Sequence, residues 1–398
     1  MKELEKDRET ERQRRMCDPL GVYISVPFCR AKCSFCNFAS GVSSPAVIDE
    51  YVEKLCAEIE AVGETAAGLG ARLPRRVDTI YFGGGTPSLL APRQLREIFA
   101  GLGRGFEIED GAEITLESAP GQIAEALLAE AMRLGVNRVS LGVQSFVDRE
   151  SAAVGRTHTE RECVREIARL RAAGLEDVGA DLIAGLPYQT RESWAHSLSV
   201  ATGVGLTHLS VYMLEVDEDS RLGREVIAGG TRFHAHGVPQ EEIAAELYEQ
   251  ACEALPNAGF AQYEISNFAL AGHQSRHNRK YWERKPYVGV GLDSHSMLLC
   301  DEGAVRFANP DELTEYGRVG LEVTRVGVRE AFEERMFLGL RLSEGVCSRE
   351  FVESLGGAVK EMVEDGLMWD EGGRWGLTLR GRMVSNEVFG RLLEGVTA

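Results

Sequence analysis

The feature that most constrains the fold is an alternation of short β-rich runs with helical segments through the first half of the chain. Six runs are rich in β-branched and apolar residues, which is typical of strands buried on both faces. These runs are Val22–Val26, Val77–Phe82, Glu113–Glu117, Arg138–Val143, Val178–Ile183 and His208–Met213. Segments between them, such as Glu160–Ala173, keep the 3.6-residue apolar period of a helix. Such repeats imply parallel strands joined by right-handed crossovers, so we predict an α/β fold built on a partial, TIM-like (β/α)6 barrel.

Beyond about residue 230 the alternation stops. A helix over Glu241–Leu255 precedes an aromatic and polar stretch over 262–296. The remainder reads as a helix over Arg329–Leu340, two short helices and a hairpin with its turn at Asp370–Gly373. That order is typical of an α+β, winged-helix-like domain. We predict a charged flexible tail at 1–18, a core barrel at 19–235, a barrel extension at 236–315 and a C-terminal domain at 316–398.

The charge balance excludes several classes of partner. The chain has 44 basic and 62 acidic residues and a net charge of -18, which argues against a broad nucleic-acid footprint and against binding to an anionic membrane. No apolar run approaches the roughly 18 residues of a membrane span, and the charged N-terminus has no apolar signal segment. We therefore expect a cytoplasmic protein with no nucleic-acid partner and at most a peripheral contact with membranes.

Three of the nine cysteines form a cluster, Cys29, Cys33 and Cys36, in the sequence CRAKCSFC after the first predicted strand. The odd number and the length of the chain argue against a secreted disulfide framework. Thiolates bind iron–sulfur clusters, and three local thiolates on a [4Fe–4S] cubane leave one iron open to a chelating small molecule. Zinc is the competing ligand for such thiolates, although a closed zinc site would need a fourth ligand.

A second motif, YFGGGTP over Tyr81–Pro87, ends the second predicted strand. Consecutive glycines let a backbone turn sharply and approach a ligand, although alone they equally describe a tight turn. Further polar residues accompany the later strands. Glu117 ends the third predicted strand, Gln144 follows the fourth, Arg156 lies in VGRTH, and Asp181 lies on the fifth. Each alone could cap a loop. Their distribution over successive strand ends predicts one shared mouth, because the carboxyl ends of parallel strands meet at one side of a barrel.

The C-x3-C-x2-C spacing resembles the signature of the radical S-adenosylmethionine (SAM) superfamily. The resemblance implies that SAM chelates the open iron through its amino and carboxylate groups, and that reduction of the cluster cleaves SAM to a 5′-deoxyadenosyl radical. Arg156 suits the SAM carboxylate, and Asp181 and Gln144 suit the ribose hydroxyls. The residues that match SAM-contacting positions are Tyr23, Phe35, Gly84, Gly85, Thr86, Glu117, Gln144, Arg156 and Asp181.

Four further sequence motifs resemble those of the family of oxygen-independent coproporphyrinogen III oxidases and the heme chaperone HemW. They are YEISNFA, RHNRKYW, GVGLDSHS and LTLRGRMVSN, and the resemblance covers roughly residues 20–395. The oxidases have a fourth cysteine where this chain has Phe38. The residues of an HNxxYW sequence resemble the chaperone's heme-binding motif, since imidazole binds heme iron and aromatic rings pack on porphyrins. These residues are His277, Asn278, Tyr281 and Trp282. The alternative is that the histidine is an ordinary hydrogen-bonded side chain.

The resemblance implies a chaperone that binds heme and a SAM-coordinated [4Fe–4S] cluster and transfers heme to an unidentified acceptor protein. It also implies an unidentified electron donor. Departures such as Ser25, and Asp293 in GLDSHS, leave open an enzyme such as an oxygen-independent coproporphyrinogen III dehydrogenase or another radical SAM enzyme acting on a tetrapyrrole. Such an enzyme would need cationic side chains to bind the propionate groups of its tetrapyrrole substrate. The candidates are Arg276, Arg279, Lys280 and Lys285, which could equally form a solvated face.

Overall fold

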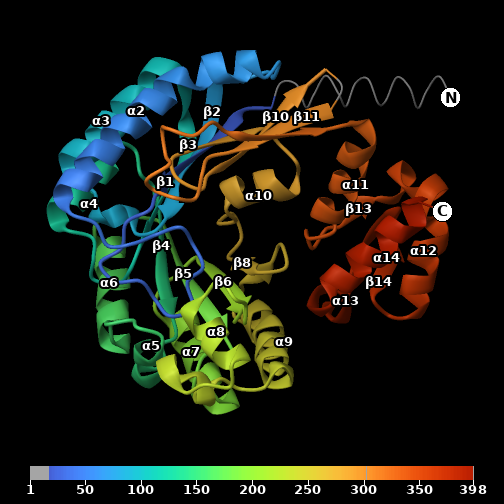
Figure 1. Cartoon of the computed structure of the whole chain (residues 1–398). Coiled ribbons are helices and arrows are strands. Elements are labelled where there is room, and N and C mark those ends of the chain that lie inside the picture. Colours follow the sequence, from blue (N-terminus) through green and yellow to red (C-terminus); the bar gives the residue numbers. More distant parts are fainter. Residues whose placement is uncertain (1–17, 302, 398) are drawn as a thin grey trace.

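One twelve-stranded sheet carries most of the molecule, which is represented by a computed structural model (Figure 1). The structure describes residues 18–301 and 303–397, so the tail predicted at 1–18 lies almost wholly outside the described residues. The strand order is β12-β11-β10-β9-β1-β2-β3-β4-β5-β6-β8-β7. Within the described ranges, no helix combines the length and the apolar character needed to cross a membrane.

Six consecutive parallel strands form the centre of this sheet and confirm the six predicted runs. They are β1 (Leu20–Val26), β2 (Arg76–Gly84), β3 (Glu107–Ser118), β4 (Arg138–Gln144), β5 (Asp177–Ala184) and β6 (His208–Met213). The six strands are parallel because helices carry the chain back between them, and they curve into the predicted partial barrel.

The crossover helices cover the outer face of the barrel (Figure 1). They are α2 (Pro45–Gly68), α3 (Pro92–Gly105), α4 (Glu125–Arg133), α5 (Asp148–Ala153), α6 (Glu160–Ala172) and α7 (Arg191–Gly203). Local sequence fixes where several begin. The Thr159 hydroxyl, for example, accepts a hydrogen bond from the Glu162 backbone N–H, and the Glu162 carboxylate accepts one from the Thr159 N–H. Along the chain, β6 is followed by α8 (Arg221–Ile227), the 3-10 helix η2 (Arg232–Gly237) and α9 (Glu241–Asn257).

The aromatic and polar stretch over 262–296 extends both ends of the sheet, which its pattern did not indicate. The strand β9 (Tyr287–Val290) pairs in parallel with β1, and antiparallel strands continue from it. These are β10 (His295–Cys300), β11 (Gly303–Ala308) and β12 (Glu322–Val326). At the far edge lie β8 (Asn267–Ala269) and β7 (Ala261–Gln262), and between the two edges runs α10 (Arg276–Trp282). Strands this short form because an existing edge supplies their hydrogen-bond partners.

The C-terminal segment forms a separate apolar core around Met336, Phe351, Leu355, Trp375 and Leu392. Its three-stranded sheet has the order β13-β15-β14, and its helices pack around that sheet. The elements are α11 (Val328–Gly339), β13 (Val346–Cys347), α12 (Val352–Glu364), β14 (Met368–Glu371), β15 (Arg374–Leu377), α13 (Leu379–Met383) and α14 (Ser385–Thr397). The predicted α+β order of the C-terminal segment is confirmed.

Candidate functional site

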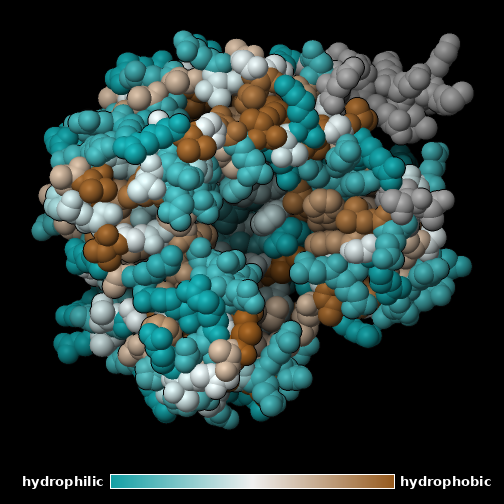
Figure 2. All heavy atoms as spheres, viewed as in Figure 1, coloured by the Kyte–Doolittle hydropathy of each residue, from teal (hydrophilic) through white to brown (hydrophobic). Residues whose placement is uncertain are grey.

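A large cavity of about 1670 Å³ lies at the carboxyl ends of the parallel strands. The molecule is hollowed near the centre of the face in Figure 2, and hydrophilic residues surround much of the opening. The cavity is lined by all three clustered cysteines and by eight of the nine residues that match SAM-contacting positions. The ninth, Tyr23, lines a smaller neighbouring pocket instead. Sequence reasoning therefore placed these side chains at one mouth correctly, apart from Tyr23.

The loop that carries the three cysteines is fastened on several sides. The Cys29 backbone N–H donates to Gly41 O (2.9 Å), which closes the loop on itself. The Ser34 N–H donates to Val154 O (3.1 Å), and Ser34 O accepts from the Leu222 N–H (2.8 Å). These bonds hold the loop between the end of α5 and the start of α8, so the thiols face the cavity in a defined arrangement.

The three clustered thiols supply the donor chemistry of an iron–sulfur cluster. Cys29, Cys33 and Cys36 all line the cavity wall. Within 18–301 and 303–397, no group of three or more His, Cys, Asp or Glu side chains is close enough to hold one ion. Thiolates bind the irons of a cubane, and three of them leave one iron without a protein ligand. The donor set therefore fits a [4Fe–4S] cluster that keeps one iron open to a small molecule.

The glycine-rich segment after β2 docks against the strand that leads into the cysteine loop. Gly84 has a φ of 99°, a conformation that favours glycine. A Cβ on Gly85 would lie 2.7 Å from Phe28 O, so only glycine permits this approach. The Thr86 N–H donates to Phe28 O (2.7 Å), and its hydroxyl lies 3.6 Å from the Cys29 thiol. Backbone of the GGGTP segment thus lines the cavity next to a cluster ligand.

Two carboxyl groups line the cavity, Glu117 near the carboxyl end of β3 and Asp181 within β5. Glu117 accepts a hydrogen bond from the Tyr81 hydroxyl (2.7 Å), and Asp181 accepts one from Ser140 (3.3 Å). Burial, with a further contribution from the Asp181 charge, raises the pKa of Glu117 to about 7. Burial also raises the pKa of Asp181. The cavity therefore holds buried carboxyl groups that can accept hydrogen bonds from the hydroxyl or ammonium groups of a ligand.

Arg156 supplies a cationic donor in the same cavity. Its guanidinium carbon lies 6.0 Å from the centre of the Phe35 ring. Its Nε is buried and has no hydrogen-bond partner among the described residues. A buried donor without a partner is costly, and an anionic ligand group would satisfy it. The cavity thus fits a molecule with a carboxylate, hydroxyls and an aromatic base, as SAM has.

Sequence reasoning missed residues that support this mouth from distant parts of the chain. Arg221, which begins α8, donates from its guanidinium to the Lys32 carbonyl in the cysteine loop. Ser140 lies within β4, where a small polar residue gives no signal of its own. Only the register of the parallel strands, which places Leu141 opposite Ala180, brings Ser140 close to Asp181.

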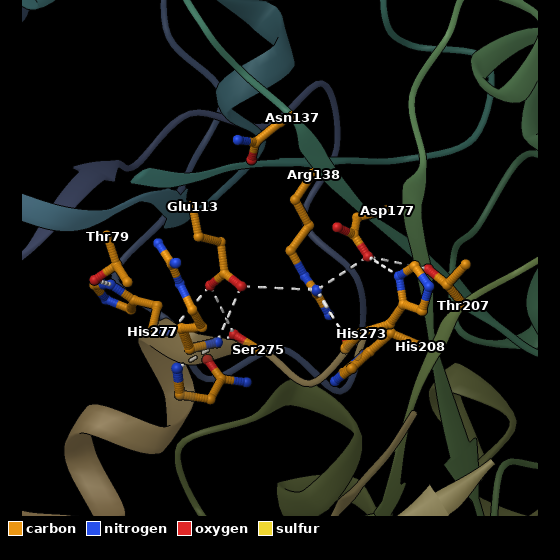
Figure 3. Close-up of polar contacts among 12 residues, drawn as sticks. Thr79, Glu113, Asn137, Arg138, Asp177, Thr207, His208, His273, Ser275 and His277 are labelled. Atoms are coloured by element: carbon orange, nitrogen blue, oxygen red, sulfur yellow. Dashed lines mark hydrogen bonds and ion pairs between the residues drawn. The ribbon is translucent and has the colours of Figure 1, made fainter. Parts of the chain in front are cut away.

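The HNxxYW segment lies at the other end of the barrel, across the amino-terminal ends of the strands (Figure 3). The Glu113 carboxylate of β3 accepts hydrogen bonds from the backbone N–H groups of Arg276 and His277, both 3.0 Å. Arg138, the first residue of β4, lies between Glu113 (3.8 Å) and Asp177 (3.6 Å) and donates to His273 O. These contacts fasten the start of α10 to the base of the barrel.

His277 is enclosed by this arrangement. Its Nδ1 lies 2.9 Å from the Thr79 hydroxyl and its Nε2 lies 2.8 Å from the Tyr281 hydroxyl. Its ring stacks on Tyr81, with centres 5.2 Å apart. Burial, with a contribution from Lys280, lowers the pKa of His277 to about 3, so the ring is neutral. With both nitrogens hydrogen-bonded, the ring offers no nitrogen to an iron atom in this conformation.

The other members of the motif do not gather on one surface. Tyr281 lines the smaller pocket. The Trp282 ring packs under the guanidinium of Arg341, 4.3 Å away. The Asn278 backbone N–H donates to Ser275 Oγ (3.2 Å), which caps α10. The four residues of HNxxYW therefore do not form a common heme site in this conformation.

The four basic residues considered for propionates are all engaged within the protein. Arg276 donates to Asp78 O and Gly111 O, and Lys280 is buried with its ammonium 2.6 Å from Asp78 Oδ1. The other two residues, Arg279 and Lys285, each form an ion pair with Glu283, at 2.7 and 2.5 Å. The interpretation as a solvated face is wrong for Lys280, because the barrel base encloses it.

Known families match both parts of the chain. The Radical SAM superfamily matches residues 23–201, and the HemN C-terminal domain matches residues 328–384. Both ranges lie inside the predicted segments 19–235 and 316–398, whose exact boundaries stay predictions. The superfamily match implies SAM and a [4Fe–4S] cluster as cofactors.

Similar proteins match almost end to end. The "Heme chaperone HemW" of Bacillus subtilis (strain 168) is 33% identical over 388 residues, covering 93% of this chain and 98% of that protein. The protein of the same name from Mycobacterium tuberculosis is 32% identical, covering 94% and 95%. The structure of coproporphyrinogen III oxidase (HemN) from Escherichia coli has a TM-score of 0.78 at 22% identity, covering 95% and 90%, and shows the same fold. The chain belongs to the HemW family of radical SAM proteins.

Proposed function

We propose that this protein is a heme chaperone that carries a SAM-coordinated [4Fe–4S] cluster and passes heme to an acceptor protein. The observation that carries the proposal is the similarity to proteins named heme chaperone HemW over 93% of this chain and 98% of the relative. An electron donor and an acceptor, both unidentified, are the partners that this function requires. The cytoplasm is the compartment that we propose for it.

We assign the cavity residues as follows. Cys29, Cys33 and Cys36 would hold the cluster and leave its fourth iron available to SAM. When bound, this pair supplies one-electron reductive cleavage of SAM. The Arg156 guanidinium pairs with the SAM carboxylate, which gives its buried Nε a partner.

We assign the remaining contacts from the resemblance to the radical SAM superfamily. The backbone of Gly84–Thr86 faces the SAM amino group, and Phe35 packs near the adenine. Gln144 and Asp181 accept from or donate to the ribose hydroxyls at the ends of β4 and β5. Glu117, beside Asp181, adds an acceptor for the SAM ammonium. These roles are supported by the shared cavity, which contains every residue named here for SAM.

Two features favour the chaperone over a decarboxylating enzyme. Phe38 stands where the related oxidases have a fourth cysteine, and its side chain is 59% exposed. The basic residues nearest the HNxxYW segment are held in internal ion pairs, so they are not free to receive the carboxylates of a porphyrinogen.

The test uses the anaerobic, cluster-loaded protein in two assays. Hemin titration followed by absorbance should show saturable binding of one heme per chain. Incubation with SAM, dithionite and coproporphyrinogen III should give no protoporphyrinogen. Formation of the decarboxylated product would make the protein a coproporphyrinogen III dehydrogenase. Failure to bind hemin would remove the chaperone function.

A further inference from the structure

A pocket of about 360 Å³ lies beside the cluster cavity and is walled largely by aromatic rings. We propose that this pocket binds heme and that His295, rather than His277, is the axial iron ligand. The inference rests on the proposed heme-binding function and adds to it a location and a ligand. The residues that carry the argument are Tyr23, Phe38, Tyr281, Tyr287, Asp293 and His295.

The walls of the pocket suit a flat apolar ring. Tyr281 and Tyr287 meet edge to face with ring centres 4.6 Å apart, and Tyr23 stands on the neighbouring strand β1. Phe38 closes the side nearest the cysteine loop. Small-molecule pockets commonly measure about 300–1,000 Å³ and are lined by aromatic residues with a few polar groups. A porphyrin inserted by one edge would cover the exposed Phe38 ring and pack against the tyrosines.

His295 is available to iron, whereas His277 is not. The His295 side chain is 70% exposed, and its Nε2 lies 3.9 Å from Asp293 Oδ1. That distance is too long for a hydrogen bond. A small rotation of the ring would let one nitrogen donate to the carboxylate while the other nitrogen binds iron. An imidazole that binds a metal almost always donates its second N–H in this way. In His277, by contrast, both nitrogens are already bonded inside the barrel.

The surroundings of the pocket fit a ligand that must later leave. The Lys32 ammonium, which lines the larger cavity, donates to the carbonyl of the wall residue Phe38 (2.9 Å), so a cation lies beside this wall. The exposed positions of His295 and Phe38 show that the pocket opens to solvent, as release to an acceptor requires. Phe38 and Gly84 line both this pocket and the larger cavity, so heme and cluster sites would share a wall.

The experiment titrates hemin into the full-length, cluster-loaded protein and records the Soret absorbance and the electron paramagnetic resonance of the ferric heme. His295→Ala should weaken hemin binding at least tenfold and abolish the imidazole-ligated spectrum. Added free imidazole should restore that spectrum. Phe38→Ala should weaken binding several-fold while keeping the spectrum. The matched control is His196→Ala, an exposed histidine paired with Glu160 on the outer helices, which should behave as wild type.

Two results would overturn the assignment. Unchanged affinity and spectrum in His295→Ala, with normal binding by the wild type, would exclude His295 and leave the chaperone function standing. Loss of the imidazole-ligated spectrum in His277→Gln but not in His295→Ala would return the ligand to the HNxxYW segment. A wild-type protein that binds no hemin would instead remove the proposed function itself, so the two failures are distinguishable.

Discussion

The two ends of the barrel contain the same kinds of polar residue, but these residues face a cavity at one end and other parts of the protein at the other. At the carboxyl ends of the strands, Glu117, Arg156 and Asp181 line a large open cavity. At the amino-terminal ends, Glu113 bonds to the start of α10 and Arg138 donates to the His273 carbonyl. Each arginine has one buried nitrogen without a partner among the described residues, but only Arg156 lines a cavity where a ligand could supply one.

This difference teaches why residue type alone misleads about function. His277 belongs to a sequence that resembles a heme-binding motif. Its two ring nitrogens are nevertheless hydrogen-bonded within the protein, to Thr79 and Tyr281, and it holds α10 to the barrel. Tyr81 touches both ends, because its hydroxyl donates to Glu117 and its ring stacks on His277. The four predictions below separate the two ends by their responses to mutation, in order of decreasing expected effect.

At the cavity end, Cys33→Ala should eliminate the cluster and all SAM cleavage. Two thiolates do not retain a cubane that depends on three local ligands. The checks are iron and sulfide content, visible absorbance and 5′-deoxyadenosine release. The matched control is Cys347→Ala, which changes a half-buried cysteine in the C-terminal domain and should retain both the cluster and SAM cleavage. A full complement of iron in Cys33→Ala would refute the cluster assignment.

At the base, Arg138→Met should cost about 3–5 kcal/mol of folding free energy. The substitution leaves the carboxylates of Glu113 and Asp177 near each other without the cation between them. Chemical denaturation of the apoprotein measures the change. Arg133→Met, whose side chain is 62% exposed, should change stability by less than about 1 kcal/mol. Equal effects of the two substitutions would show that the base network contributes no special stability.

Also at the base, His277→Gln should destabilise the fold by about 1–3 kcal/mol, because buried hydroxyls of Thr79 and Tyr281 lose well-placed partners. Hemin affinity of the folded variant should remain within about twofold of wild type. The measurements are thermal unfolding and hemin titration. Normal thermal stability combined with lost hemin binding would contradict the structural role.

Back at the cavity, Glu117→Gln should stabilise the apoprotein at high pH by about 1–2 kcal/mol. The pKa of Glu117 is raised from 4.5 to about 7, so the folded state retains a proton that the unfolded state releases between these values. Wild-type stability therefore falls as the pH rises through this window, and glutamine removes that loss. The gain should vanish below about pH 4.5. A pH-independent difference between the two proteins would contradict the shifted pKa.

Opposite signs at the two ends would themselves be informative. Removing a charged or polar group from the base destabilises the protein, whereas removing one from the cavity stabilises it. Functional sites commonly sacrifice stability in this manner, because their polar groups wait for a ligand. The same sign at both ends would show that the cavity groups are as well satisfied as those at the base.

The sequence by itself determined the six parallel strands, the grouping of polar residues at their carboxyl ends and the cysteine motif. These features are encoded locally, since strand composition, helix period and motif spacing each lie within a few residues. It also predicted the α+β order of the C-terminal segment. Position relative to a strand end was enough to place Glu117 and Asp181 at one mouth, because parallel strands share their direction.

Only the tertiary structure decided that His277 is enclosed and that His295 is exposed. Whether an imidazole is free depends on partners such as Thr79, which lies 198 residues before His277 in the chain. The same holds for the strands β9 to β12, because β9 finds its parallel partner only at the edge of β1 and the later strands continue from it. Local patterns specify the elements, but the satisfaction of a buried polar group is a property of everything packed around it.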